Sequence, residues 1–172
     1  MIIREANQAD IAEIQAIYAH YVLNTAFSFE EEPPDCAEMT KRWQEIISKG
    51  LPYLVAEKDG KIAGFAYAGP FRMRSAYRYT LEDSIYVAPG MRQAGVGNTL
   101  LTEIINKATA LGYRQMIAVI GDANNTASIS LHSKLGFHKE GVLRGVGYKF
   151  GRWYDVVIMH MALRVLDNLP SG

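Results

Sequence analysis

Residues 84–111 read SIYVAPGMRQAGVGNTLLTEIINKATAL and decide how this chain folds. The first of these residues favour a strand, which Pro89 ends. A turn containing Gly95 and Gly97 follows, and apolar residues then recur at helical spacing. Glycine lets the backbone approach an anion closely, and the first N–H groups of a helix have no internal partner. Together with the charge of Arg92, the strand, turn and helix therefore predict a site for a pyrophosphate.

Two other interpretations of the turn stay open from these residues. One is a dinucleotide fingerprint, G-x-G-x-x-G, although Leu100 stands where its third glycine belongs. Asp122 follows the next apolar run, where the ribose-binding acid of such a site is expected. In the other interpretation, the glycines serve only the geometry of the helix start.

The composition excludes several classes of protein. The 172 residues suit one domain, which we place at 1–165, followed by a C-terminal tail at 166–172. Eighteen basic and eighteen acidic residues give a formal net charge of zero, which argues against a nucleic-acid partner. Cys36 is the only cysteine, so we expect no internal disulfide, no metal cluster and a cytoplasmic location. No apolar run reaches the length that spans a membrane.

Periodicity and turn signals predict the remaining elements. Strands are expected near residues 2–4, 53–56, 62–68, 78–87, 113–120, 137–143 and 148–163. Helices are expected between residues 10 and 21, 35 and 50, 98 and 112, and 124 and 136. The order βααβββαβαββ predicts an α/β fold, with a mixed sheet flanked by helices.

Two motifs point to a family. Residues 92–97, RQAGVG, fit the acetyl-CoA motif Q/R-x-x-G-x-G/A of the GCN5-related N-acetyltransferase (GNAT) superfamily. Asn125, Ser128, His132 and the pair Gly136-Phe137 match the spacing of a second signature of that superfamily. The chain resembles the superfamily over roughly residues 2–163. The resemblance implies the GNAT fold, a mostly antiparallel twisted sheet of about seven strands flanked by helices, and acetyl-CoA as co-substrate without a metal.

A closer resemblance is to the phosphinothricin and methionine sulfoximine/sulfone N-acetyltransferases. It is carried by residues 80–87, 118–121, 128–132 and 147–156. It implies acetyl transfer to the α-amine of a small amino-acid analogue, commonly in a homodimer. The implied cofactor-binding residues are Ile85, Tyr86, Val87, Arg92, Gln93, Ala94, Gly95, Val96, Gly97, Asn98, Asn125, Ser128 and Ser133.

Acetyl transfer requires a base, because an amine attacks a thioester only when it is neutral. Glu82 is the candidate, since it lies on the strand that leads into the glycine turn and matches the subgroup's catalytic glutamate. Strand alternation puts Ser84 on the same face as Glu82 and puts Asp83 on the other face. Only one of the two carboxylates is therefore expected to face the cleft. The alternative role for Glu82 is that of a solvated strand carboxylate.

Two residues of the second signature have two interpretations each. His132 either donates a proton to the departing thiolate or only lines the cofactor groove. Asn125 either binds the pantetheine arm or only caps the helix that follows it. The backbone of the strand at residues 85–87 is expected to pair with the pantetheine arm, as a peptide extends a sheet edge.

The substrate side rests on aromatic and basic residues around the expected cleft. Arginine suits the carboxylate of an amino-acid analogue. The candidates for binding the substrate are Phe27, Phe29, Arg72, Arg74 and Tyr77. Lys149 and Trp153 either close the pocket or form a dimer surface. Two alternative functions stay open, an acetyltransferase for protein N-terminal amines and a CoA-binding sensor without turnover.

Overall fold

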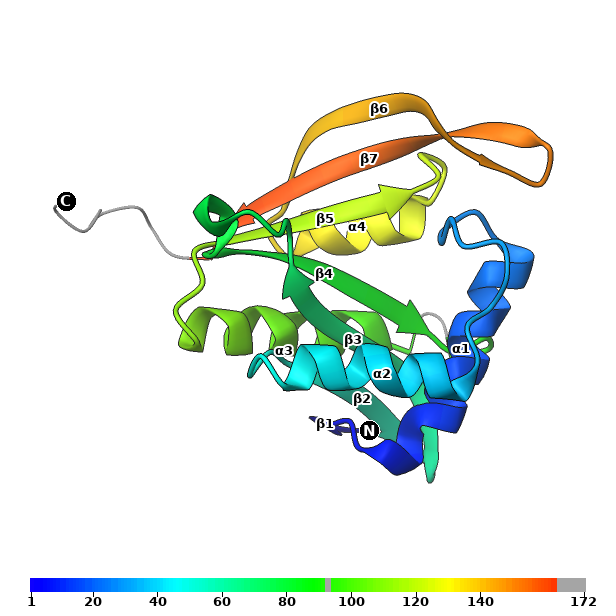
Figure 1. Cartoon of the computed structure of the whole chain (residues 1–172), viewed down its shortest axis with the longest axis vertical. Coiled ribbons are helices and arrows are strands. Elements are labelled where there is room, and N and C mark those ends of the chain that lie inside the picture. Colours follow the sequence, from blue (N-terminus) through cyan, green and yellow to red (C-terminus); the bar gives the residue numbers. More distant parts are fainter. Residues whose placement is uncertain (92–93, 164–172) are drawn as a thin grey trace, which may run out of the picture.

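Within the described residues, 1–91 and 94–163, the computed structural model forms a seven-stranded sheet in the order β1-β2-β3-β4-β5-β7-β6 (Figure 1). The strands are β1 (Ile2–Glu5), β2 (Tyr53–Lys58), β3 (Lys61–Pro70), β4 (Thr80–Val87), β5 (Gln115–Gly121), β6 (His138–Lys149) and β7 (Arg152–Ala162). In this part of the chain, β4 and β5 are the only parallel neighbours. The predicted element order and the mostly antiparallel sheet are confirmed. The tail expected at 166–172 lies outside the described residues.

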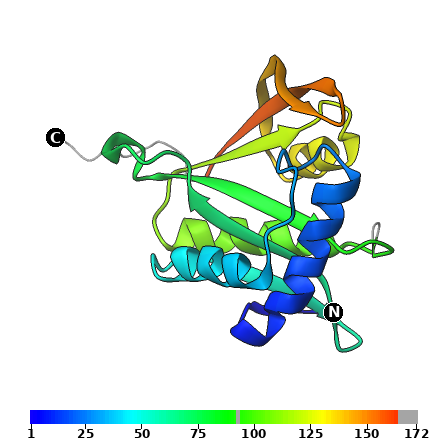
Figure 2. The ribbon, with the colours of Figure 1, turned by 45° about the vertical axis from the view of Figure 1, so that its right-hand side comes forward.

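Helices cover both faces of the sheet. The helices α1 (Ile11–Asn24) and α2 (Cys36–Ile47) lie on one face, and α3 (Val96–Ala110) and α4 (Thr126–Lys134) lie on the other (Figure 2). Alternation along β2 divides the core, because Tyr53 and Val55 pack in the cluster of α1 whereas Leu54 and Ala56 pack in the cluster of α3. Coverage on both sides explains why the inner strands are continuous apolar runs.

Short 3-10 helices precede two of the regular elements. One, η1 (Gln8–Asp10), leads into α1, and its Asp10 carboxylate accepts two hydrogen bonds from the Arg4 guanidinium of β1 at 2.7 and 2.8 Å. The other, η2 (Ser75–Tyr77), lies just before β4. Because η2 takes up the preceding residues, β4 begins at Thr80, two residues later than the strand predicted from residue 78.

The parallel pair β4 and β5 is short, and its end opens the sheet. The pairing runs from Thr80 opposite Gln115 to Asp83 opposite Ala118, and the two strands then diverge. On its other side, β4 stays paired with β3 as far as Val87. The sheet therefore forks after Asp83, with unpaired backbone on the inner edge of β4. We call this opening the fork.

The hairpin of β6 and β7 extends beyond its neighbours in the sheet (Figure 1). The turn predicted at Gly151-Arg152 lies between the end of β6 at Lys149 and the start of β7 at Arg152, and β6 continues, with an irregularity between Leu143 and Gly147, through the gap left between the predicted strands 137–143 and 148–163. No helix of residues 1–91 and 94–163 is long and apolar enough to cross a membrane.

Candidate active site

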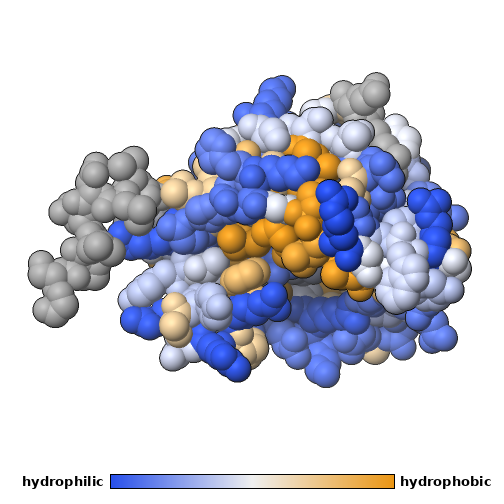
Figure 3. All heavy atoms as spheres, turned by 90° about the horizontal axis from the view of Figure 1, so that it is seen from above, coloured by the Kyte–Doolittle hydropathy of each residue, from blue (hydrophilic) through white to orange (hydrophobic). Residues whose placement is uncertain are grey.

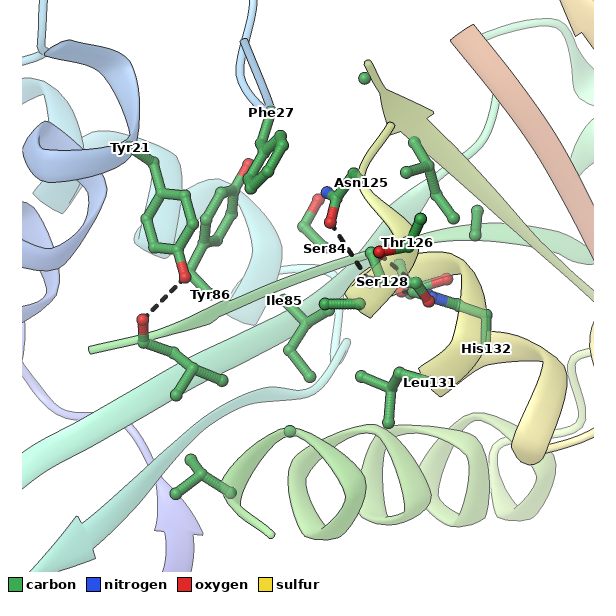
Figure 4. Close-up of a pocket in the computed structure, with 18 of the residues that line it drawn as sticks. Tyr21, Phe27, Ser84, Ile85, Tyr86, Asn125, Thr126, Ser128, Leu131 and His132 are labelled. Carbon is green, nitrogen blue, oxygen red and sulfur yellow. Dashed lines mark hydrogen bonds and ion pairs between the residues drawn. The ribbon is translucent and has the colours of Figure 1, made fainter. Parts of the chain in front are cut away.

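A cleft of about 640 Å³ lies at the fork. Figure 4 shows Tyr21, Phe27 and Tyr86 on one side of it, and Asn125, Ser128 and His132 from α4 on the other. The predicted site residues that line the cleft are Phe27, Ile85, Tyr86, Val87, Gly95, Val96, Gly97, Asn98, Asn125, Ser128 and His132. The fork therefore gathers residues from α1, β4, α3 and α4 around one opening.

The inner edge of β4 offers backbone groups to a ligand. The Ala88 N–H donates to the Ala63 carbonyl oxygen at 2.9 Å, which sets the phase of the β3–β4 ladder. In that phase the backbone groups of Tyr86 face β3, and those of Ile85 and Val87 face the cleft. The Tyr21 hydroxyl donates to the Val87 carbonyl oxygen at 2.8 Å, so that acceptor is occupied. Tyr86, expected to contribute through its backbone, instead contributes its side chain to the lining.

The glycine turn leads into the first turn of α3 at one end of the cleft. Gly95 is the N-cap residue of α3 and has φ +78°, a left-handed conformation that favours glycine. Because glycine has no side chain, the first N–H groups of α3 have no side-chain cap. Ala94 is exposed and does not line the cleft. Arg92 and Gln93 lie outside the described residues.

Gly97 has a packing role that the sequence did not predict. A Cβ added there would lie 3.2 Å from the Leu131 side chain of α4 and close to the side chains of Val87 and Ile85. Gly97 therefore lets α3 approach α4 and β4, and a bulky side chain would disturb that packing as well as any bound anion.

Helix α4 supplies the opposite wall. The Asn125 side chain accepts a hydrogen bond from the Ser128 N–H at 3.2 Å, so Asn125 is the N-cap of α4. Asn125 also lines the cleft, so the second predicted role is compatible with the first. Ser133, predicted with the cofactor-binding residues, is exposed and does not line the cleft.

His132 is buried and bonded through both ring nitrogens. Its Nδ1 lies 2.8 Å from the Ser128 carbonyl oxygen, and its Nε2 lies 3.0 Å from Asp83 Oδ2. Burial lowers the pKa of His132. The hydrogen bond to Asp83 and the charge of Asp83 together raise the pKa by more than burial lowers it, so the pKa of His132 lies above its usual value. Sequence reasoning placed Asp83 on the face opposite Glu82 and gave it no role. The signal in the sequence was an acidic residue at a core-facing position of a strand, because a buried carboxylate needs a partner.

Comparison with known proteins now identifies the family. A model described as "Acetyltransferase (GNAT) domain" matches residues 3–158. This chain belongs to the GNAT acetyltransferase family. It is an acyltransferase, and acetyl-CoA is its co-substrate.

The relatives of this GNAT chain carry specific names. It is 51% identical over 170 residues to a phosphinothricin N-acetyltransferase of Alcaligenes faecalis, covering 98% of this chain and 86% of the relative. It is 39% identical over 163 residues to an L-methionine sulfoximine/L-methionine sulfone acetyltransferase of Salmonella typhimurium, covering 95% of each. A solved phosphinothricin acetyltransferase (Pat) of Sinorhizobium meliloti in complex with AcCoA superposes with a TM-score of 0.91, at 46% identity and 94% and 87% coverage.

Glu82 of this GNAT domain is not among the residues that line the cleft, although Ser84 and Tyr86, which share its face of β4, are. Its strand neighbour Ser84 and the Tyr67 phenol of β3 form a hydrogen bond on that same face. Glu82 is half-buried, and its pKa is raised by burial and by the charge of Asp83, with Arg72 acting in the opposite direction. The strand alternation predicted for Glu82 and Asp83 is confirmed, but the carboxylate that lines the cleft is Asp83.

The predicted arginines of the loop before β4 are exposed. The Arg72 guanidinium lies over the Phe71 ring, 4.9 Å from its centre, and Tyr77 meets the same ring edge-on at 5.7 Å. Arg74 is exposed at the start of η2. Arg72, Arg74 and Tyr77 do not line the cleft, and the charge effect of Arg72 on Glu82 links this loop to the Glu82 face.

Lys149 holds the loop after α1, which sequence reasoning missed. Its ammonium donates to the carbonyl oxygens of Val22, Thr25 and Ser28 at 2.7, 2.8 and 2.7 Å. The residue is 2% exposed, so it neither closes the pocket nor lies on a surface, whereas Trp153 is 67% exposed. Because Lys149 lies on β6, it ties the hairpin to the loop that carries Phe27.

The two loop phenylalanines separate. Phe27 lines the cleft, and its backbone packs against Gly121, where a Cβ would lie 3.0 Å from the Phe27 carbonyl oxygen. Phe29 instead lies on the hairpin, where its ring covers Gly147 and is tilted against Tyr154. Phe29 is therefore absent from the cleft lining of the described residues. In the same described ranges, 1–91 and 94–163, no group of three or more His, Cys, Asp or Glu side chains is placed to hold a metal ion.

Proposed function

We propose that this GNAT enzyme transfers the acetyl group of acetyl-CoA to the α-amine of a small amino-acid analogue. The names of the relatives supply the class, phosphinothricin, methionine sulfone or methionine sulfoximine. The observation that carries the mechanism is the two-sided β4. After Asp83, residues from both faces of β4 line the cleft, and Glu82, on the face of Ser84 and Tyr86, is a half-buried carboxylate with a raised pKa.

In this mechanism Glu82 is the general base. An α-ammonium is mostly protonated near neutral pH, and a base whose pKa is raised toward the working pH accepts its proton more effectively. The neutral amine then attacks the thioester carbon, and the C–S bond breaks with its electron pair going to sulfur. Two protons leave nitrogen in a turnover, one ending on the CoA thiol and one in solvent. We assign delivery of the thiol proton to His132.

The cofactor is proposed to lie along the fork. The backbone groups of Ile85 and the N–H of Val87, which face the cleft, resemble a free sheet edge and suit the amide groups of pantetheine. The uncapped N–H groups at the start of α3 suit the pyrophosphate. Asn125 and Ser128 line the opposite wall and suit polar groups of the same arm.

We expect Gly95→Ala to raise the dissociation constant of acetyl-CoA roughly tenfold, which corresponds to about 1.4 kcal/mol. An alanine strains the left-handed backbone at this position, which distorts the turn that starts α3. Isothermal titration calorimetry measures the effect. Gly90→Ala is the matched control, because Gly90 has a similar φ of +84° but does not line the cleft. Equal losses of affinity in both variants would show that the turn is not part of the pyrophosphate site.

Arg72 is proposed to bind the substrate carboxylate. We expect Arg72→Ala to raise the KM of the amine roughly tenfold to a hundredfold, because losing a charge-assisted hydrogen bond costs about 1.5–3 kcal/mol. The KM of acetyl-CoA should change little. Arg74→Ala is the comparison, since Arg74 lies on the same loop without an effect on Glu82. Equal changes in the two KM values would assign Arg72 to the cofactor or to stability.

A substrate panel tests the function itself. Thiol release from acetyl-CoA is measured with phosphinothricin, methionine sulfone, methionine sulfoximine, the common amino acids and short peptides. Fast turnover of the first three supports the proposal. Preference for peptides would favour an acetyltransferase for protein N-terminal amines, and CoA binding without turnover of any amine would favour a sensor.

A homodimer in the cytoplasm completes the proposal. Figure 3 looks onto the side of the molecule that carries β6 and β7, where apolar residues gather in the middle of the surface. Large hydrophobic side chains are exposed along the hairpin, namely Leu143, Val146, Tyr148, Phe150 and Trp153. Such a cluster fits the surface of a second copy. Sedimentation equilibrium that returned the monomer mass at micromolar concentration would contradict it.

A further inference from the structure

Asp83 and His132 join two walls of the cleft where the sheet opens. Asp83 is the last residue of β4 that pairs with β5, and His132 lies on α4. Each side chain is 2% exposed, and the contact joins residues 49 positions apart. Both residues line the cleft in which the cofactor is proposed to bind.

The hydrogen-bond geometry indicates how many protons the pair of Asp83 and His132 holds. The Ser128 carbonyl oxygen can only accept, so its 2.8 Å contact with His132 Nδ1 is a hydrogen bond only if Nδ1 carries a hydrogen. Nε2 faces a carboxylate oxygen at 3.0 Å, and this contact is a hydrogen bond only if a proton lies between the two atoms. The pair therefore holds one proton more than a carboxylate beside a neutral imidazole, and its net charge is zero.

The surroundings favour placing that proton on the ring. Asp83 Oδ1 is buried without a hydrogen-bond partner, and among the described residues His132 is the one group that pairs with this carboxylate. The other groups that face the ring are the Ser128 hydroxyl, 3.3 Å from Nδ1, and the Phe137 ring, edge-on at 4.9 Å. Neither carries a charge. Loss of the proton would leave an uncompensated buried carboxylate, which is strongly unfavourable.

We propose that Asp83 is a positioning residue that keeps a proton on His132 Nε2 for transfer to the departing CoA thiolate. The proposal rests on the proposed acetyl transfer. As the C–S bond breaks, the sulfur competes with Asp83 for the Nε2 proton and takes it, which forms the thiol. The ring becomes neutral, and its Nδ1–H stays hydrogen-bonded to the Ser128 carbonyl oxygen. One of the two protons released from the amine then restores the pair, and the other goes to solvent.

A purely structural role makes a different prediction, and one substitution separates the two. In Asp83→Asn the side-chain amide can donate to Nε2 of a neutral ring, so the link between β4 and α4 is kept. An amide does not hold the ring in its doubly protonated form. A structural link alone therefore leaves turnover unchanged in Asp83→Asn, whereas proton storage predicts that turnover falls.

The experiment combines imidazole nitrogen NMR of the free full-length enzyme with single-turnover kinetics. His132→Asn identifies the His132 signals by their loss. We expect both ring nitrogens of His132 to stay protonated well above the usual histidine pKa of about 6.5 in the wild type, and only one in Asp83→Asn. We expect the acetyl-transfer rate of Asp83→Asn to fall by roughly 10²-fold or more, with acetyl-CoA affinity kept.

Two results would overturn the inference. One is a wild-type His132 with a single protonated nitrogen at neutral pH, which needs no variant to fold. The other is an Asp83→Asn enzyme with a neutral His132 and the wild-type rate. The NMR measurement needs no substrate, so it is independent of the amine class. Failure of every amine in the panel beside a doubly protonated His132 would count against the proposed function while supporting the protonated pair.

Discussion

Glu82→Gln lowers kcat by roughly 10²–10⁴-fold and leaves acetyl-CoA binding nearly unchanged, if Glu82 is the general base. Glutamine keeps the size and hydrogen-bonding reach of the side chain but does not accept a proton. Stopped-flow measurement of thiol release gives the rate, and calorimetry gives the affinity. The exposed Glu45 of α2 provides the control, because Glu45→Gln makes the same change of charge at a residue that does not line the cleft.

The pH profile gives a second, independent reading of the same variant. Burial and the charge of Asp83 raise the pKa of Glu82, and the active form is deprotonated, so activity should be lost as pH falls through this raised pKa. In Glu82→Gln the substrate loses its proton to water. The limb of the pH profile, meaning the range in which activity rises with pH, should therefore move toward the pKa of the amine itself. A variant that keeps both the wild-type rate and the wild-type limb would show that another group takes the proton.

Lys149→Met should lower the free energy of unfolding by about 3–5 kcal/mol. Methionine has a similar length but no donor, so three carbonyl oxygens, in two buried contacts and one part-buried contact, would lose their partner, at about 1–3 kcal/mol each before relaxation. Urea unfolding followed by tryptophan fluorescence measures the loss. Lys139→Met is the matched control on β6, since Lys139 is exposed. Similar losses in both variants would mean that Lys149 does not anchor the loop.

The same variant links stability to the substrate side. The carbonyl groups that Lys149 binds belong to the end of α1 and to the loop that places Phe27 in the cleft. Loosening that loop removes one wall of the opening. The folded fraction of Lys149→Met should therefore also show a higher KM for the amine.

Local patterns were enough to predict the elements. A strand that ends at a proline, a glycine turn and an apolar stripe each state a requirement of the nearby backbone, and β4, Gly95 and α3 follow them. The alternation along β4 also held, because the side chains of a strand must point to opposite faces. The glycine turn and the second signature together predicted which elements meet at the cleft.

The sequence by itself determined the order of elements, the family and part of the set of residues that line the fork. Only the tertiary structure decided where β4 and β5 part, that Asp83 meets His132, that Lys149 reaches Val22 across 127 residues and that Phe29 lies on the hairpin. The reason is physical. Element type depends on residues that are neighbours in the chain, whereas these contacts depend on strand register and helix packing, which are set by the whole core.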